Sequence, residues 1–243
     1  MVSASGTPEL LTGRVIAVTG ASRGIGEAIA RRAAESGANV LGVSRSGTAP
    51  EHERIAALTA DVCDDDAPNR ILDGALAAFG RLDALVNCAA TNHHADCWEH
   101  SDAAWDEVFT TNLTAPFLLS QRAVVHWLDA GVPGVIVNIT SIESEVSCPQ
   151  QCSYASTKGG LLGLTRAMAV ELSGRGIRVV CLAPGYTDTE AETVNPDGLD
   201  ALIPVGRMAQ PDEIAGAAVF LLSDLASYAT GTTLFVDGGY TAR

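Results

Sequence analysis

The stretch that decides the fold is Val15-Ile-Ala-Val-Thr19, followed directly by Gly20-Ala-Ser-Arg-Gly-Ile-Gly26. The apolar and β-branched run predicts a buried strand, and the glycines at 20, 24 and 26 lead into a helical pattern. Glycine suits these positions because the turn is tight, a pyrophosphate must approach the backbone, and the new helix packs closely on the sheet. The helix N-terminus offers unpaired N–H groups to an anion. The stretch therefore predicts a phosphate-binding strand, loop and helix.

The rest of the chain repeats this alternation. Strands are predicted at 15–19, 39–43, 58–62, 84–87, 135–140, 178–182 and 232–236, and helices at 26–36, 67–79, 104–128, 153–173 and 211–223. Such alternation implies right-handed crossovers and a parallel sheet covered on both faces. We expect an α/β fold, a Rossmann-like doubly wound seven-stranded parallel sheet flanked by helices. A single domain should span 12–243 after a flexible segment at 1–11, with a candidate lid at 187–206.

Composition excludes several classes of function. Of the 243 residues, 29 are Asp or Glu and 15 are Lys or Arg, which gives a formal net charge of −14. This charge opposes binding to nucleic acid and to anionic membranes. Without an export signal or an apolar run of ~20 residues, we expect a cytoplasmic protein. The six cysteines form no Cys-x-x-Cys pair, so we expect reduced thiols and no metal site.

The end of the second predicted strand bears on the choice of nucleotide. It reads Val43-Ser44-Arg45-Ser46, without the carboxylate that would accept the ribose 2′-hydroxyl of NAD. Arg45, together with Arg23 of the glycine loop, can offer planar bidentate donors to a phosphate. NADP(H) is therefore favoured, while NAD(H) stays possible. Asp61, after the third strand, either accepts a bond from the adenine amino group or caps the strand end.

Three residues form a candidate reacting centre. Tyr154 and Lys158 are four residues apart in a helical pattern, so their side chains emerge on one face. An adjacent ammonium favours the phenolate and lowers the pKa of a tyrosine, which suits it to proton transfer. Ser141 stands at the carboxyl end of the predicted 135–140 strand, where its hydroxyl can bond a substrate oxygen on which charge develops.

The sequence resembles the short-chain dehydrogenase/reductase family over residues 12 to 240. The resemblance is carried by the glycine loop, Asp61, Asn87-Cys88-Ala89-Ala90, Asn112, Ser141, Tyr154, Lys158, Pro184-Gly185, Thr189 and Val236-Asp237-Gly238-Gly239. It implies a catalytic tetrad with Tyr154 as general acid/base, Lys158 lowering its pKa and binding the nicotinamide ribose, Ser141 orienting the carbonyl, and Asn112 holding a water of the proton relay. It also implies a tetramer.

The predicted cofactor-binding residues follow from the loop, the strand ends and this resemblance. They are Gly20, Ser22, Arg23, Gly24, Ile25, Gly26, Ser44, Arg45, Asp61, Val62, Asn87, Ala89, Tyr154, Lys158, Pro184, Gly185, Thr187 and Thr189. Thr189 would touch the nicotinamide amide. Two residues depart from the family pattern: Ala90 replaces a customary glycine, and Val180 a customary asparagine.

The sequence predicts an NADP(H)-dependent oxidoreductase acting on a ketone or secondary alcohol of a small polar molecule. His93, Glu143 and Tyr186 are the candidate substrate residues, although His93 and Glu143 can equally be solvated loop residues. One alternative is a 3-oxoacyl-[acyl-carrier-protein] reductase, which the charge of the chain opposes. Another is a non-catalytic dinucleotide-binding scaffold. Small and apolar residues after Lys158 favour a homotetramer or homodimer.

Overall fold

The structure is a computed structural model that describes residues 9–189 and 198–242. Its strands are β1 (Val15–Thr19), β2 (Asn39–Ser44), β3 (Ile55–Thr59), β4 (Ala84–Asn87), β5 (Gly134–Ile139), β6 (Ile177–Pro184) and β7 (Thr233–Val236). Its α-helices are α1 (Gly24–Glu35), α2 (Ala67–Phe79), α3 (Asp102–Phe109), α4 (Ala115–Ala130), α5 (Cys152–Leu172) and α6 (Pro211–Leu222). The alternation predicted from the sequence is confirmed.

The strands form one parallel seven-stranded sheet in the order β3-β2-β1-β4-β5-β6-β7. The order reverses between β1 and β4, where the chain has crossed from one half of the sheet to the other. Because all strands are parallel, their carboxyl ends lie at one edge, and the reversal opens a crevice there. The Rossmann-like doubly wound fold is confirmed.

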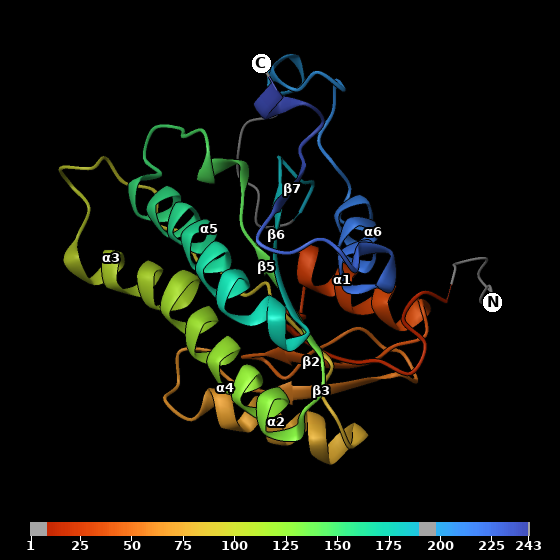
Figure 1. Cartoon of the computed structure of the whole chain (residues 1–243). Helices are drawn as coiled ribbons and strands as arrows, with labels where there is room; N and C mark the ends of the chain where they lie inside the picture. Colours follow the sequence, from red (N-terminus) through yellow and green to blue (C-terminus); the bar gives the residue numbers. More distant parts are fainter. Residues whose placement is uncertain (1–8, 190–197, 243) are drawn as a thin grey trace.

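Helices cover both faces of the sheet, and each face has its own apolar core. Figure 1 shows α1 and α6 on one side and α2, α4 and α5 on the other. The first core contains Ile29 of α1 and Ile214 of α6, and the second contains Ile71 of α2 and Trp127 of α4. Central strands such as β1 and β5 are buried along their whole length, which explains their unbroken apolar runs.

Two predicted elements differ from the structure. The third strand runs over Ile55–Thr59 instead of 58–62, because its register is set by pairing with β2, from Val40 opposite Ile55 onward. Its half-exposed edge position leaves only a weak apolar pattern. The helix predicted at 104–128 is interrupted by a π-helical turn at Thr110–Thr114, which separates α3 from α4. Such turns insert one residue into the helical ladder and often accompany functional sites.

The predicted flexible segment at 1–11 and the candidate lid are only partly described. Of the predicted flexible segment 1–11, residues 1–8 lie outside the described residues, whereas Leu11 is fully buried and donates its N–H to Ser36 O. Residues 190–197 of the candidate lid likewise lie outside them. Among the described residues, no helix has the length and apolar character needed to cross a bilayer, and no three His, Cys, Asp or Glu side chains cluster as metal ligands.

Candidate active site

The glycine loop lies where β1 and β4 end side by side. Thr19 Oγ1 accepts hydrogen bonds from the backbone N–H groups of Cys88 and Ala89 at 3.0 and 3.1 Å, which ties the two strand ends together. Gly20 has φ +72°, and a Cβ there would lie 3.0 Å from the Ala89 backbone. A Cβ on Gly26 would lie 2.2 Å from Gly20 O. Glycine is therefore required at both positions, because another backbone segment lies where a Cβ would be.

The start of α1 is suited to bind a phosphate group. The first turn of an α-helix has N–H groups without intrahelical acceptors. The N-cap residue of α1 is Arg23, and its side chain does not bond to these groups. Ser22 and Arg23 are exposed beside these donors. Uncapped donors and close-packed glycines fit the diphosphate of a dinucleotide. The adjacent Arg23 guanidinium can bond a further phosphate.

The carboxyl end of β2 carries the residues predicted to select the nucleotide. Arg45 is exposed, whereas Ser44 is buried and donates its hydroxyl to Thr48 O at 2.8 Å, so that hydroxyl already has an acceptor in the protein. Asp61 Oδ1 accepts from Cys63 N at 3.0 Å, a bond within the loop that follows β3. Val62 is partly buried against the core beneath α2.

Tyr154 and Lys158 lie in the first turns of α5. Lys158 is 3% exposed, donates from Nζ to Ile139 O at 2.9 Å, and places Nζ 5.3 Å from the centre of the Tyr154 ring. Thr140 Oγ1 donates to Lys158 O at 3.0 Å and fixes this turn of the helix to the end of β5. Burial lowers the pKa of Lys158 to about 8. Lys158 Nζ thus lies beside the Tyr154 ring, on the helix face that the spacing of the two residues predicts.

Ser141 follows β5 at the same edge of the sheet. It is the N-cap of a 3₁₀ turn, Ile142–Ser144, and its Oγ accepts from Glu143 N at 3.1 Å. This bond uses a lone pair of the oxygen, so the hydroxyl hydrogen is still able to donate to a substrate oxygen. The sequence does not indicate that the cap would orient Ser141 in this way.

The π-helical turn presents Asn112 between two other segments. Its Oδ1 accepts from Thr91 N at 2.9 Å, and its Nδ2 donates to Thr91 O at 2.8 Å and to Thr157 Oγ1 at 3.3 Å. The side chain thus fastens the loop after β4 to α5 beside Tyr154. The contribution of Thr91 and Thr157 is visible only in the structure.

The loop after β6 reaches the glycine loop. Gly185 donates its N–H to Val236 O at 3.0 Å, and a Cβ on it would lie 2.7 Å from Asp237 Cα. Thr187 Oγ1 donates to Gly185 O at 3.0 Å. A Cβ on Gly24 would lie 3.4 Å from Thr189 Cγ2, so Thr189 lies over the start of α1. Pro184, Thr187 and Thr189 are thus at the edge where a dinucleotide would bind.

Asn87 differs in its surroundings from the other predicted cofactor residues. Its Nδ2 donates to Asn138 Oδ1 at 2.8 Å and lies 3.1 Å from Ser120 Oγ, and Asn138 in turn donates to Thr165 Oγ1 at 2.9 Å. This buried chain of side chains links β4, β5 and α5. Asn87 therefore supports the sheet edge from inside the core.

The three candidate substrate residues do not form one group. His93 Nε2 lies 2.8 Å from Glu107 Oε2 on α3. Glu143 Oε2 accepts from Ser147 Oγ and Cys148 N, and Cys148 Sγ lies 3.4 Å from Tyr186 Oη. Tyr240 packs edge-on to Tyr186 with ring centres 5.5 Å apart. Glu143 and Tyr186 thus meet through Cys148, and neither Cys148 nor Tyr240 was predicted from the sequence.

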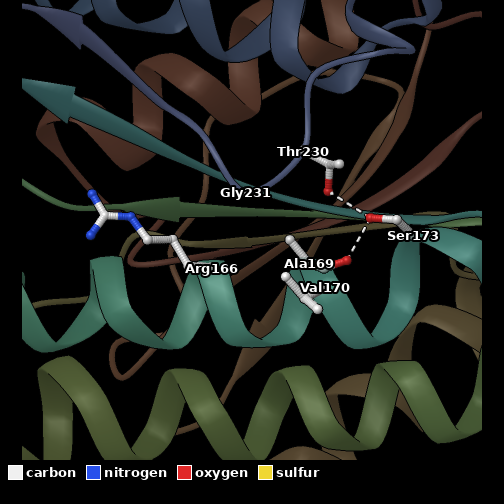
Figure 2. A pocket seen from close by; sticks show the side chains of 6 residues that line it. All are labelled: Arg166, Ala169, Val170, Ser173, Thr230 and Gly231. Atoms are coloured by element: carbon white, nitrogen blue, oxygen red, sulfur yellow. Dashed lines mark hydrogen bonds between the residues drawn. The ribbon is translucent and has the colours of Figure 1, made fainter.

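A separate hollow of about 340 Å³ lies near the other end of α5. Figure 2 shows its lining, in which Ser173 Oγ bonds to Ala169 O and Thr230 Oγ1 while the Arg166 side chain extends away from them. Twelve residues separate Tyr154 from Arg166, which corresponds to ~18 Å along the helix. This hollow is therefore distinct from the candidate active site.

The doubly wound sheet, the glycine loop at its reversal point and the Tyr154–Lys158 pair at the same edge define a dinucleotide-binding oxidoreductase. Comparisons with known proteins agree. A family model described as "Enoyl-(Acyl carrier protein) reductase" matches residues 20–241. The chain belongs to the short-chain dehydrogenase/reductase family and is an enzyme of that class.

Curated relatives and a solved structure resemble the chain over nearly its whole length. It is 38% identical to 3beta-hydroxysteroid dehydrogenase 1 of Eggerthella lenta, with 95% of each chain covered. It is 39% identical to D-threitol dehydrogenase of Mycolicibacterium smegmatis, covering 96% of this chain and 95% of the relative. A putative 2-deoxy-D-gluconate 3-dehydrogenase of Agrobacterium tumefaciens, solved with bound NADP, has a TM-score of 0.86 at 36% identity, covering 97% and 99% of the two chains.

The burial of Lys158 predicts a pH-dependent contribution to stability. Below about pH 8 the native protein holds a buried ammonium, whereas the unfolded chain keeps its proton up to the ordinary pKa of 10.5. Between these values the unfolded state binds more protons, so stability rises with pH. Lys158→Met removes the free-energy cost of burying this ammonium group. The gain in unfolding free energy of Lys158→Met over wild type should therefore be larger at about pH 7 than at about pH 10, by on the order of 2 kcal/mol.

Urea unfolding of both cofactor-free proteins at the two pH values measures this difference. Burial raises the pKa of the Cys88 and Cys181 thiols to about 11, which lowers stability above about pH 9. These thiols are present in both proteins, so their effect largely cancels in the comparison. An equal gain at both pH values would contradict the prediction.

Proposed function

We propose that the chain is an NADP(H)-dependent oxidoreductase that moves hydride between the nicotinamide and a ketone or secondary alcohol of a small hydroxylated molecule. One observation carries this proposal. Tyr154 and Lys158 lie on one face of α5, at the same edge of the sheet as Ser141 and the glycine loop. A dinucleotide and a proton-transferring side chain are both needed for carbonyl reduction, and this edge offers sites for both.

In the proposed mechanism the residues of the chain handle the proton and the substrate oxygen. Bound NADP(H) supplies the hydride chemistry. Tyr154 gives its phenolic proton to the substrate oxygen during reduction and takes it back during oxidation. Lys158, when charged, stabilises the phenolate from beside the ring, and Ser141 donates its hydroxyl hydrogen to the same substrate oxygen.

Two arginines support the preference for NADP(H). Arg23 and Arg45 are exposed at the start of α1 and the end of β2, and no acidic residue stands between Arg45 and Pro50. Exposed guanidinium groups can bond a phosphate bidentately. The related NADP-bound structure is consistent with this choice.

The substrate is proposed to be free and polar. Glu143, Cys148 and Tyr186 form a chain of polar contacts that begins two residues after Ser141, and the relatives include an enzyme named for threitol and a structure named for a deoxygluconate. A second candidate, a 3-oxoacyl-[acyl-carrier-protein] reductase, is favoured by a relative of that name and by the acyl-carrier-protein substrate in the description of the family model. An acidic carrier would have to approach a chain of net charge −14, which like-charge repulsion opposes.

A substrate panel tests the proposal. NADPH oxidation would be followed with hydroxyketones, simple ketones and an acetoacetyl thioester, and NADP reduction with the matching polyols. We expect turnover of free hydroxylated compounds well above that of the thioester. Preference for the thioester would establish the second candidate, and NADP(H) binding without turnover of any compound would favour a non-catalytic scaffold.

The proposal extends to assembly and compartment. Large apolar side chains are exposed along α4 and α5, including Phe117, Leu118, Val125 and Val170, and the last of these is 86% exposed. Figure 1 shows these two helices side by side on the outside of the molecule. Exposed apolar surface of this kind favours contact with a second copy. A homodimer or homotetramer in the cytoplasm, with its cysteines reduced, is the state we propose.

A further inference from the structure

A polar cluster joins the loop after β4 to the start of α5. It consists of Asn92, His94 and Gln151, and we refer to it as the Asn92 cluster. Asn92 Nδ2 lies 2.8 Å from Gln151 Oε1 and 3.4 Å from His94 Nε2, and Gln151 Nε2 lies 3.3 Å from His94 Nδ1. The three side chains therefore form a closed ring of amide and imidazole groups.

The Asn92 cluster lies beside Tyr154. Gln151 is the N-cap of α5, and Tyr154 follows three residues later, in the first turn of the helix, about 4.5 Å further along its axis. The loop that carries Asn92 is fastened to the same helix, because Asn112 bonds both Thr91 and Thr157. Figure 1 shows the loop between β4 and α3 passing the beginning of α5.

Asn92 has an amide group that its neighbours do not satisfy. Its Oδ1 is buried and, within the described part of the chain, has no hydrogen-bond partner. A buried amide oxygen without a donor costs free energy unless a ligand or water supplies one. Rotating the amide by half a turn would exchange oxygen and nitrogen and place an unpaired donor at the same position. A hydroxyl group can both donate and accept, so it pairs with the amide in either orientation.

His94 closes the cluster on its exposed side. Both of its ring nitrogens face amide NH₂ groups, at 3.4 Å from Asn92 and 3.3 Å from Gln151. A neutral imidazole accepts at only one nitrogen, so it cannot pair with both amides as a donor–acceptor partner at once. One amide hydrogen is then left for another acceptor. Within the described residues Asn92 Oδ1 is thus the one polar atom of the cluster that is buried without a partner, and the amide hydrogen beside the exposed His94 is available to a substrate oxygen.

We propose that the Asn92 cluster binds a substrate hydroxyl that takes no part in hydride transfer, and that it thereby selects polyhydroxylated substrates over their deoxy analogues. This inference rests on the proposed function, since it places the reacting carbon at Tyr154. A site built to bond a hydroxyl discriminates against an analogue that lacks it, because its buried polar groups are then left unpaired.

The test compares erythrulose with butan-2-one, which share a carbon skeleton and differ in their hydroxyl groups. Reduction by NADPH is measured for wild type, Asn92→Leu and Gln151→Leu, which replace each amide with an apolar group. Gln150→Asn serves as the control, because Gln150 is exposed, bonds Asp96 instead of the cluster, and has a φ of +66° that asparagine tolerates. Saturation-transfer NMR of threitol in the presence of NADP gives a second readout that needs no turnover.

We expect wild type and Gln150→Asn to favour erythrulose in kcat/KM by about tenfold or more, and each leucine variant to lose most of this preference while it still reduces butan-2-one. Threitol saturation transfer should fall in the same variants. Turnover with an unchanged preference in Asn92→Leu overturns the inference and leaves the proposed function standing. Absence of turnover in wild type, with threitol binding that still depends on Asn92, overturns the proposed function and supports the cluster as a hydroxyl site. Threitol binding and turnover both independent of Asn92 overturn the inference.

Discussion

Replacing Tyr154 with Phe should lower kcat by ~10²–10⁴ while NADPH binds as in wild type, because the change removes only the proton donor. The ring remains, so its packing beside Lys158 Nζ, 5.3 Å from the ring centre in wild type, is kept. The loss should appear in both directions of the reaction, since the same oxygen gives and accepts the proton. Stopped-flow measurement of hydride transfer under single turnover, together with NADPH titration by fluorescence, separates chemistry from binding.

Tyr228 supplies the matched control. Its side chain is fully exposed, and Tyr228→Phe removes the same hydroxyl away from the candidate site. Near-normal turnover in Tyr154→Phe would reject the proposed mechanism, because another group would then have to move the proton. Weakened NADPH binding together with lost turnover would instead assign Tyr154 a role in holding the cofactor.

The second large effect concerns cofactor choice. Arg23→Ala and Arg45→Ala together should raise the Kd of NADPH by on the order of 10²-fold, since each charge-assisted bond to a phosphate contributes about 1.5–3 kcal/mol. The Kd of NADH should change little, because NADH lacks the 2′-phosphate. Both constants can be measured by nucleotide fluorescence, at low and high salt, and the NADPH effect should shrink as salt screens the charges.

Arg54 provides the control for this pair. It is exposed immediately before β3, at the amino edge of the sheet, whereas Arg23 and Arg45 stand at the carboxyl edge. Arg54→Ala removes one positive charge, half of what the double variant removes, and should leave both constants unchanged. An equal loss for NADPH and NADH in the double variant would mean that the arginines hold the shared diphosphate, and the proposed preference for NADP(H) would then lose its support.

Local sequence was sufficient for the features that depend on near neighbours. The glycines at 20, 24 and 26 predict a tight turn. In that turn a Cβ on Gly26 would meet Gly20 O, and Gly20 and Gly26 belong to the same short segment of sequence. The spacing of Tyr154 and Lys158 specifies one helix face without reference to the rest of the chain. The buried strands were also predicted locally, because a short apolar run bounded by turn residues indicates a buried strand.

Elements that depend on distant partners were predicted less well. The edge strand β3 takes its register from β2, so its true start at Ile55 is not evident from its own half-exposed residues. The π-helical turn at Thr110–Thr114 interrupts a stretch that has an ordinary helical pattern, and Asn112 in that turn bonds to Thr91 and Thr157. No local pattern encodes those contacts.

The candidate substrate residues illustrate the same limit. The sequence grouped His93 and Glu143 as polar residues near the site, but His93 pairs with Glu107, whereas Glu143 and Tyr186 meet through Cys148. Tyr240, near the C-terminal end of the chain, packs against Tyr186 in the same group of side chains. The direction in which a loop side chain points is set by partners that only folding brings close.

The sequence by itself determined the glycine loop and the tyrosine–lysine pair, because each depends on residues only a few positions apart. It also determined the doubly wound sheet and the family, because the alternation of strands and helices and the family motifs recur along the whole chain. The tertiary structure alone decided which polar side chains satisfy one another and which are left with an unpaired atom, as Asn92 is. The physical reason is that hydrogen bonds reach only about 3 Å, so the partners in a site are fixed by the packing of segments that lie far apart in the chain.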